Sequence, residues 1–363
     1  MKKVLVCPLD WGIGHASRCV PLIRILREQG FEVIIAADQR PLDFLRREFP
    51  DIRLFRFPGT PIRYPKSNRM ALRMLRLTPS LVRGIWKENR LLKKIVVQTG
   101  ADLIISDNRY GCWHPNIQSV IMTHQLSIQV PSRLHLLRGI LNSLSFYFIK
   151  KYDECWIPDF ELHKGLAADL SHPELLPPNT HYIGVLSRFS DKIEPLPEQT
   201  IPVFDLLVML SGPEPQRTML EERILDQLTN ITLRTAIVRG IPETEEEYII
   251  DNRVHVFSHL ETDKMKALIL SSGLVICRSG YSSIMDLVTL GKRAIFIPTP
   301  GQTEQEYLAR KLMERKIFFS MEQKNFDLLY ALEMSKNFPG MLLQNDYSVL
   351  EERISRFASR QDK

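Results

Sequence analysis

A glycine-rich segment near the start of the chain carries the side chain best suited to proton transfer. Gly12, Gly14 and His15 lie between an apolar stretch at residues 3–9 and a helical pattern that ends at Gly30. Glycines let a ligand approach the backbone, and the N–H groups at a helix start attract anions. Because histidine titrates near neutral pH, His15 is a candidate base that takes a proton from an attacking hydroxyl. A histidine that only forms local hydrogen bonds is the alternative, and position alone leaves both open.

A dinucleotide-binding interpretation of the same segment is weaker. It requires the pattern G-x-G-x-x-G, and the third glycine is replaced by Ser17. Asp38, at the end of the next apolar stretch, would then contact a ribose. The missing glycine favours another ligand for this turn.

A second strand–turn–helix pattern, at residues 277–286, suits phosphate groups. Small hydroxyl side chains and backbone N–H groups gather at its helix start, and an aspartate two turns along would reach a ribose. The residues concerned are Arg278, Ser279, Gly280, Ser282, Ser283 and Asp286. An ordinary serine-capped helix is the alternative.

Two further loops follow strands in the same half of the chain. The loop at 298–307 combines polar side chains with prolines, and such side chains suit the hydroxyls of a sugar. The turn at 210–215 would face the expected cleft from another strand. The residues expected to bind substrate in these loops are Ser211, Gly212, Gln302, Glu304 and Gln305.

Several catalytic motifs are absent from the chain. It contains no D-x-D carboxylate pair, no G-x-x-x-x-G-K-[ST] and no G-x-S-x-G. These absences disfavour a metal that bridges a diphosphate, a P-loop NTPase and a nucleophile elbow. The charge of a leaving diphosphate would then be met by helix N-termini, Arg278 and small hydroxyl side chains. We therefore expect no metal and no cofactor besides the donor substrate.

The apolar pattern of the chain predicts a fold in which the loops that follow the strands lie close together. Apolar stretches of strand length alternate with helical periodicities, which is typical of parallel sheets covered on both faces. Ligands bind beyond the carboxyl ends of such strands. The predicted fold class is α/β, with two Rossmann-like doubly wound domains facing across a cleft. The expected strands are 3–9, 31–37, 102–107, 119–122, 155–158, 181–184, 204–210, 233–238, 254–257, 274–277 and 294–297.

The domain boundaries follow from a change of pattern in the middle of the chain. Residues 187–202 carry three prolines and no period, so they are interpreted as a linker. We expect an N-terminal acceptor domain at 1–190 and a C-terminal nucleotide-sugar donor domain at 203–340. A helix within 341–363 is expected to cross back to the N-terminal domain.

Composition favours a soluble protein in a reducing compartment. The 363 residues are 44% hydrophobic and 25% charged, and their number suits two domains. The five cysteines are scattered without a C-x-x-C pair, which disfavours a disulfide framework or a zinc knuckle. No apolar run reaches 18 residues, and Asp10 interrupts the first one, so neither a spanning helix nor a signal peptide is expected. We expect a cytoplasmic location.

Charge differs between the two halves of the chain. Residues 1–190 hold 27 Lys and Arg against 16 Asp and Glu, a net charge of +11, whereas 191–363 hold 21 against 26, a net charge of −5. The basic stretch at 63–94 indicates an anionic partner such as a membrane surface or a phosphorylated acceptor, with a solvated helical face as the alternative. No nucleic-acid module accompanies the charge, so nucleic acid is not expected. The apolar segment 136–149, flanked by basic residues, either lies at a membrane surface or is a buried helix. Peripheral attachment to the inner face of the membrane thus stays open.

Two stretches of the chain resemble a known family. Trp11-Gly12-Ile13-Gly14-His15 resembles the G-x-G-H loop of the GT-B glycosyltransferases, especially the MurG-like branch (the glycosyltransferase family 28 type). Residues 254–312 resemble the donor-binding region of that branch. There Cys277–Gly280 match its C-R-S-G turn, Pro298 its V-P loop, and Gln305 with Tyr307 its Q-Q-Y segment. The pattern, with Arg18, is closer to bacterial relatives of MurG than to MurG itself.

The resemblance implies roles for the matching positions. His15 would lie beside the diphosphate and the acceptor, Phe257 near the nucleotide base, Ser279 and Gly280 at the phosphates, Asp286 at the ribose and Gln305 at the donor sugar. Three departures weaken the match, because Asp286 and Glu306 replace a glutamate and a glutamine, and Ser211–Glu214 replace a glycine-rich turn.

The resemblance also indicates an acceptor site. Thr123-His124-Gln125 is similar to the H-E-Q-N segment that lines the cleft in this branch, and Asp107-Asn108-Arg109 would complete the site. A buried histidine and a capping aspartate with purely structural roles are the alternative.

The function implied by the resemblance is an inverting, metal-independent transfer. A hexose or N-acetylhexosamine would move from a UDP-sugar to a hydroxyl acceptor, which could be lipid-linked, with His15 or Asp107 as the base. A nucleotide-sugar hydrolase is one alternative, because Gly12, Gly14, His15 and Arg18 reproduce the G-x-G-H-x-x-R pattern of a hydrolase branch. A non-catalytic nucleotide-sugar binding protein on the same fold is the other.

Overall fold

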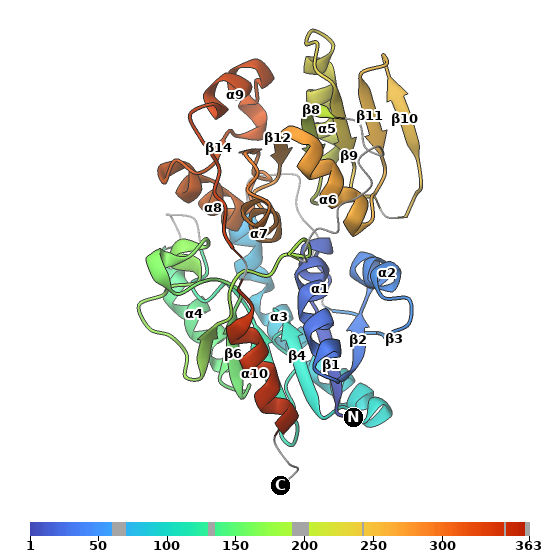
Figure 1. Ribbon diagram of the computed structural model, residues 1–363. Coiled ribbons are helices and arrows are strands. Elements are labelled where there is room, and N and C mark those ends of the chain that lie inside the picture. The colour runs from blue at the N-terminus through green and yellow to red at the C-terminus, as the bar shows by residue number, and fades with distance from the viewer. Residues whose placement is uncertain (60–69, 130–134, 191–202, 242, 345, 360–363) are drawn as a thin grey trace. The chain divides into compact units, whose positions relative to one another are not determined.

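The chain folds into two compact units, shown in the computed structural model of Figure 1. The described residues of 1–59, 71–188 and 346–359 make up unit 1, and those of 189–344 make up unit 2. The predicted linker lies outside the described residues from position 191 onward. The structure describes residues 1–59, 70–129, 135–190, 203–241, 243–344 and 346–359, without the side chains of 70–78, 135–137 and 164.

Unit 1 is built on a sheet whose described strands are all parallel, in the order β3-β2-β1-β4-β5-β6-β7. The central strands are apolar and buried at nearly every position, as expected for a sheet covered on both faces. Pro8 pairs with Asp107, and Asp107 pairs with Met122, so the carboxyl ends of three neighbouring strands lie side by side. The strands are β1 (Lys3–Pro8), β2 (Glu32–Ala37), β3 (Arg53–Arg56), β4 (Leu103–Asp107), β5 (Gln118–Met122), β6 (Glu154–Ile157) and β7 (Thr180–Tyr182).

The helices of unit 1 pack their apolar faces on this sheet. In α3, Leu92, Ile95 and Val96 join side chains of β1, β2 and β4 in one core cluster. In α4, Ile149 packs with β5 and β6 in a second cluster. The helices are α1 (Ile13–Glu28), α2 (Gln39–Glu48), α3 (Met70–Thr99) and α4 (His135–Ile149), with the short 3-10 helices η2 (Leu162–Lys164) and η3 (Ala168–Leu170).

The last helix, α10 (Ser348–Ser359), belongs to unit 1 although it follows unit 2 in the chain (Figure 1). Its buried stripe consists of Leu350, Ile354 and Phe357. The Phe357 ring lies 6.2 Å from the Trp156 ring of β6, measured between centroids, and the Phe357 carbonyl accepts a hydrogen bond of 2.9 Å from Lys2 Nζ. The helix therefore completes the apolar shell of unit 1.

Unit 2 repeats the architecture with one difference. Its strand order is β10-β11-β9-β8-β12-β13-β14, and β10 pairs antiparallel with β11 while the other described pairs are parallel. The strands are β8 (Phe204–Met209), β9 (Thr235–Val238), β10 (Glu247–Ile250), β11 (Val254–Phe257), β12 (Ser272–Cys277), β13 (Ala294–Phe296) and β14 (Phe319–Ser320). The helices are α5 (Gln216–Leu228), α6 (Thr262–Ser271), α7 (Tyr281–Thr289), α8 (Thr303–Glu314), the 3-10 helix η4 (Gln323–Asn325) and α9 (Leu328–Ser335).

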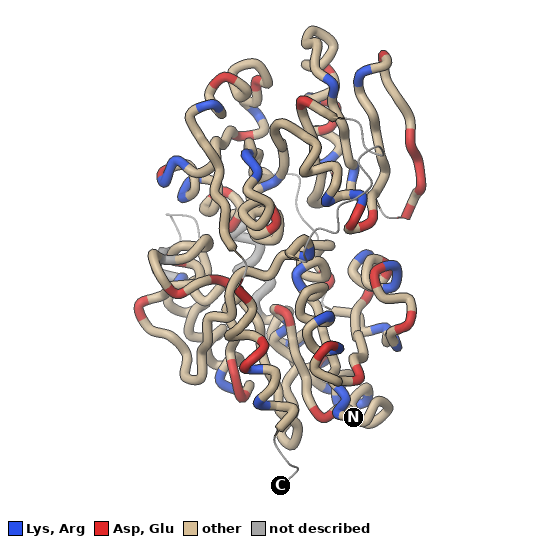
Figure 2. The backbone as a smooth tube through the Cα atoms, viewed as in Figure 1, with Lys and Arg blue, Asp and Glu red and all other residues tan. Residues whose placement is uncertain are grey.

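The predicted fold class is confirmed, since both units are doubly wound α/β sheets. The sequence pattern missed some elements, and β10 shows why. It is an exposed edge strand that continues an acidic segment (Figure 2). Its apolar run of three residues is shorter than those of the buried strands, so it was not recognised. Of the basic stretch at 63–94, residues 63–69 lie outside the described residues, and the rest forms most of α3. No helix in the described part of the chain is long and apolar enough to cross a membrane.

Candidate active site

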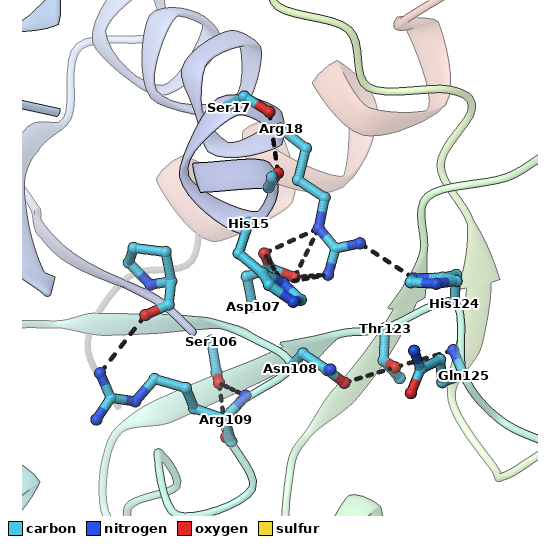
Figure 3. Close-up of polar contacts among 12 residues, drawn as sticks. His15, Ser17, Arg18, Ser106, Asp107, Asn108, Arg109, Thr123, His124 and Gln125 are labelled. Carbon is cyan, nitrogen blue, oxygen red and sulfur yellow. Dashed lines mark hydrogen bonds and ion pairs between the residues drawn. The ribbon is translucent and has the colours of Figure 1, made fainter. Parts of the chain in front are cut away.

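The adjacent carboxyl ends of β1, β4 and β5 bring four ionisable side chains of unit 1 together (Figure 3). Asp107 is the last residue of β4, and His124 lies two residues beyond β5. His15 and Arg18 are in the first turns of α1, which follows β1. Gly12 makes the turn into α1 with φ of +137°, a conformation that favours glycine.

His15 and Asp107 form an oriented imidazole–carboxylate pair. Nδ1 of His15 lies 3.0 Å from Oδ2 of Asp107. The Asp107 side chain is 1% exposed, whereas that of His15 is 19% exposed. A buried carboxylate at Nδ1 orients an imidazole and stabilises its charged form after the ring has taken a proton. The pair thus has the geometry of a general base oriented by a carboxylate.

Arg18 neutralises the same carboxylate from inside the unit. Its Nε donates to Oδ1 and Oδ2 of Asp107 at 2.9 and 2.8 Å, and its NH2 donates to Oδ1 as well. NH1 lies 3.0 Å from Nδ1 of His124, and NH2 lies 2.9 Å from Nδ1 of His15. The residue is 1% exposed. The sequence predicts Arg18 to bind substrate; the structure instead directs its guanidinium to protein side chains.

Opposing effects act on the pKa of Asp107. Burial alone would raise the pKa of this carboxyl, but the charge of Arg18 and the hydrogen bonds from Arg18 and His15 lower it below its ordinary value. Asp107 is therefore ionised at neutral pH. It can orient His15 and stabilise the imidazolium that forms when the ring takes a proton.

The segment expected at the acceptor is fixed by hydrogen bonds within unit 1. Thr123 Oγ1 donates to Asn108 Oδ1 at 3.0 Å and accepts from the Gln125 backbone N–H at 3.1 Å. Arg109 is directed away from this segment, because its Nε donates to Glu88 at 2.7 Å. His124 contacts Arg18, which in turn binds Asp107. The acceptor role of His124 and Gln125 stays a prediction.

In unit 2, the helix starts at the carboxyl edge of the sheet differ in charge. Helix α7 has neither a side-chain cap nor an acidic residue in its first turn. Every other α-helix that the structure describes in unit 2 has a carboxylate at its start. At α5 this is Glu214, which precedes the helix and accepts a hydrogen bond from the Thr218 N–H at 3.3 Å. The others are Glu261 and Asp263 at α6, Glu304 and Glu306 at α8 and Asp327 at α9. An incoming anion is therefore favoured at α7, because the first turn of this helix carries no acidic residue.

A hydrogen-bonded network joins the loops around the start of α7. Ser279 Oγ donates to the Gln305 carbonyl at 2.8 Å, and the Thr299 N–H donates to Gln305 Oε1 at 2.8 Å. Gln305, predicted to contact the donor sugar, uses its carboxamide oxygen inside the protein, which leaves its nitrogen for such a contact. The Thr299 hydroxyl is buried without a hydrogen-bond partner, close to Gly212. Thr299 is not among the residues predicted from the sequence, although its position directly after an apolar strand is typical of a site residue.

Arg278 has a structural environment that its sequence position did not reveal. NH1 donates to the carbonyls of Ile297 and Pro298 at 2.9 and 3.3 Å, and NH2 donates to that of Gln216 at 2.8 Å. Burial lowers the pKa of this guanidinium to about 10, which still leaves it charged at neutral pH. Arg278 therefore ties β12, β13 and α5 together, and a direct contact with phosphate stays a prediction.

The remaining predicted donor residues all lie in unit 2. Phe257 ends β11 and is partly buried, and Asp286 is buried in the second turn of α7. Gly280 and Ser282 are at the start of α7, Ser211 and Gly212 follow β8, and Gln302 and Glu304 are at the start of α8. Among the described residues, no group of three or more His, Cys, Asp or Glu side chains is arranged to hold a metal ion.

Comparisons with known proteins agree with this architecture. Residues 220–335 match the model of the glycosyltransferase family 28 C-terminal domain. A UDP-N-acetylglucosamine–N-acetylmuramyl-(pentapeptide) pyrophosphoryl-undecaprenol N-acetylglucosamine transferase of Granulibacter bethesdensis is 24% identical over 329 residues, covering 86% of this chain and 79% of that protein. Among solved structures, MurG of Acinetobacter baumannii aligns with a TM-score of 0.54 at 13% identity, over 99% of this chain and 100% of that chain. The spinosyn rhamnosyltransferase SpnG aligns with a TM-score of 0.62 at 14% identity, over 98% of this chain and 96% of that chain.

The fold and these matches define a glycosyltransferase of the GT-B type. Residues 220–335 are a glycosyltransferase family 28 C-terminal domain, and the chain is similar to the MurG-like branch of that class.

Proposed function

We propose that the protein transfers a sugar from a UDP-sugar to a hydroxyl acceptor, with inversion at the anomeric carbon and without a metal. The observation that carries this proposal is the pair of His15 and Asp107, 3.0 Å apart, at the carboxyl edge of the unit 1 sheet. A partly exposed imidazole on a buried carboxylate suits the deprotonation of a hydroxyl. The sugar is a hexose or an N-acetylhexosamine.

The proposed reaction is a single displacement. The acceptor oxygen forms a bond to the anomeric carbon while the bond from that carbon to the diphosphate oxygen breaks. Nε2 of His15 takes the hydroxyl proton, and the imidazolium then donates Nδ1–H to Asp107. The leaving UDP carries away the bonding electron pair, and its growing negative charge is met by the N–H groups at the start of α7.

The donor site is proposed for unit 2. Helix α7, with Ser279 and Gly280 before it, receives the diphosphate because its start carries no carboxylate. Asp286 on the same helix would bind the ribose, and Phe257 the base. The name of the Granulibacter bethesdensis relative, a UDP-N-acetylglucosamine-dependent transferase, supports uridine. SpnG was solved with thymidine diphosphate, so a thermal-shift comparison of UDP with thymidine diphosphate tests the choice of base.

The acceptor is proposed to be lipid-linked, with the protein in the cytoplasm and bound peripherally to the inner face of the membrane. The name of the same relative, which acts on an undecaprenol-linked substrate, supports this. In unit 1, Trp86 of α3 and Tyr147 of α4 are 40% and 53% exposed, and Lys151 Nζ lies 5.7 and 4.7 Å from their ring centroids. Exposed aromatic rings with lysines suit a membrane surface of anionic lipids. Flotation with anionic liposomes tests the proposal, and protein that stays at the bottom of the gradient contradicts it.

Product analysis tests the transferase proposal. Purified protein is incubated with a radiolabelled UDP-sugar and candidate acceptors, with and without EDTA, beside His15→Gln. A labelled glycoside that forms equally in EDTA and is lost in the variant supports transfer. Free sugar formed without an acceptor, also lost in the variant, indicates the hydrolase that the His15–Arg18 spacing allows. Binding of UDP without turnover would indicate a nucleotide-sugar binding protein.

A further inference from the structure

Arg18 joins ionisable side chains from three different elements of unit 1 (Figure 3). It contacts Asp107 at the end of β4, His124 beyond β5, and His15 on its own helix. At 1% exposure the guanidinium is out of reach of a bound substrate. Any influence of Arg18 on a reaction must therefore act through these neighbours.

The contact between Arg18 and His124 determines where the His124 proton is. A guanidinium only donates hydrogen bonds and keeps its charge in proteins. Nδ1 of His124, 3.0 Å from NH1 of Arg18, must therefore present its lone pair, so the ring proton is on Nε2. A proton on Nδ1 would set two N–H groups against each other and place a second cation beside Arg18 in a buried site. His124 is thus held neutral.

His15 has a different set of neighbours. Its Nδ1 faces Oδ2 of Asp107 at 3.0 Å as well as NH2 of Arg18 at 2.9 Å. The contact with Arg18 alone would favour the lone pair on Nδ1, as at His124, but the neighbouring carboxylate can accept a hydrogen bond from Nδ1–H. A charged His15 ring therefore has a partner of opposite charge. The other titratable group at this cluster is the buried Cys19, whose pKa is raised by burial and by Asp107. The thiol is thus uncharged and adds no cation or anion.

We propose that Arg18 is a positioning residue that gives the two histidines different roles. It keeps His124 a neutral hydrogen-bond donor through Nε2, and it leaves His15 as the histidine that takes a proton. The assignment of the base rests on the proposed function, whereas the state of His124 does not.

The first test needs neither a substrate nor a variant of Arg18. Two-bond 1H–15N correlation spectra of the histidine rings are recorded on 15N-labelled protein from about pH 5 to 8, where histidines ordinarily titrate. His15→Gln and His124→Gln assign the signals. We expect His124 to carry its proton on Nε2 and to stay neutral throughout. A His124 ring that titrates, or that carries its proton on Nδ1, overturns the proposal. Failure to find any turnover would overturn the proposed function and leave these spectra unaffected.

The second test removes the guanidinium. In Arg18→Met, we expect His124 to gain a titration step, and turnover to fall about 100-fold because the base is no longer held in place. Arg18→Lys can donate to Asp107 or to His124 but not to both, so we expect partial recovery. Arg27→Met, on the same helix with an exposed partner at Asp51, is the control and should keep the wild-type spectrum and rate. A folded Arg18→Met whose His124 still does not titrate overturns the proposal. If Arg18→Met fails to fold, the protonation of His124 in Arg18→Lys and in the wild-type spectra tests the proposal instead.

Discussion

Replacement of Asp107 by asparagine removes the one negative charge that Arg18 and His15 share. The carboxylate is 1% exposed and accepts hydrogen bonds from Arg18 through both oxygens. The substitution leaves the Arg18 guanidinium buried without its counter-ion, and breaking a buried ion pair from one side costs about 3–5 kcal/mol. We expect the free energy of unfolding of unit 1 at pH 7 to fall by this amount.

The loss should depend on pH in a defined direction. Because the pKa of Asp107 is lowered in the folded protein, its stabilising effect is fully present above the unfolded pKa of about 3.9. The effect is lost as the pH falls through the folded pKa, where the folded carboxylate also becomes protonated. Asparagine does not titrate. The difference in stability between wild type and Asp107→Asn should therefore not decrease between pH 7 and about pH 5, and it should shrink at lower pH.

Urea unfolding followed by tryptophan fluorescence measures this difference. All four tryptophans lie in residues 1–190, so their fluorescence reports on unit 1. Asp51→Asn, at a side chain that is 60% exposed in its pair with Arg27, is the control and should change stability by less than about 1 kcal/mol. The reasoning would be refuted if Asp107→Asn were as stable as the wild type at pH 7. It would also be refuted if the difference in unfolding free energy between the two proteins stayed constant down to pH 3.5.

Three further predictions concern other parts of the molecule. Ser282→Asp puts a carboxylate in the first turn of α7, so we expect UDP affinity in a thermal-shift titration to fall at least about tenfold. The protein without UDP should be stabilised by about 0.3–1 kcal/mol. Gln216→Glu at α5 is the matched control, and an equal loss of UDP affinity in both variants would contradict the assignment of α7. Phe357→Ala empties a site that is 4% exposed and should cost about 3–5 kcal/mol in urea unfolding, whereas Val349→Ala, 42% exposed on the same helix, should cost little. Lys151→Glu should reduce flotation with anionic liposomes without changing UDP affinity, and unchanged flotation would count against the membrane surface.

Much of the fold could be predicted because buried parallel strands are almost continuously apolar. The predicted strands at 102–107 and 274–277 correspond closely to β4 and β12. Elements at the margin of a sheet escape this reasoning, since they keep few apolar residues. β3 has only half-buried side chains between exposed ends, and β14 has two residues.

The candidate site could be predicted only in part. The rule that ligands bind at the carboxyl ends of parallel strands identified His15, and the family resemblance added Asp107. The strand register brings the elements of these two residues together. The sequence could not show whether an arginine faces a ligand or a carboxylate. Arg18 and Arg278 are both predicted at the substrate, and in the structure both guanidinium groups bind protein atoms. Residue type gives the charge of a side chain, whereas its partners depend on residues far away in the chain.

The position of α10 has a consequence for biosynthesis. The strands of unit 1 are complete once β7 has been made, but the apolar surface that α10 covers, including Trp156, has no cover until its last turn leaves the ribosome. At about 5–20 residues per second, the roughly 180 intervening residues take about 10–35 s to synthesise. During that time the nascent chain exposes an apolar surface that a chaperone can bind. A recombinant unit 1 ending at residue 190 would keep that surface permanently, so an isolated domain should be designed with α10 joined to it by a short artificial connection.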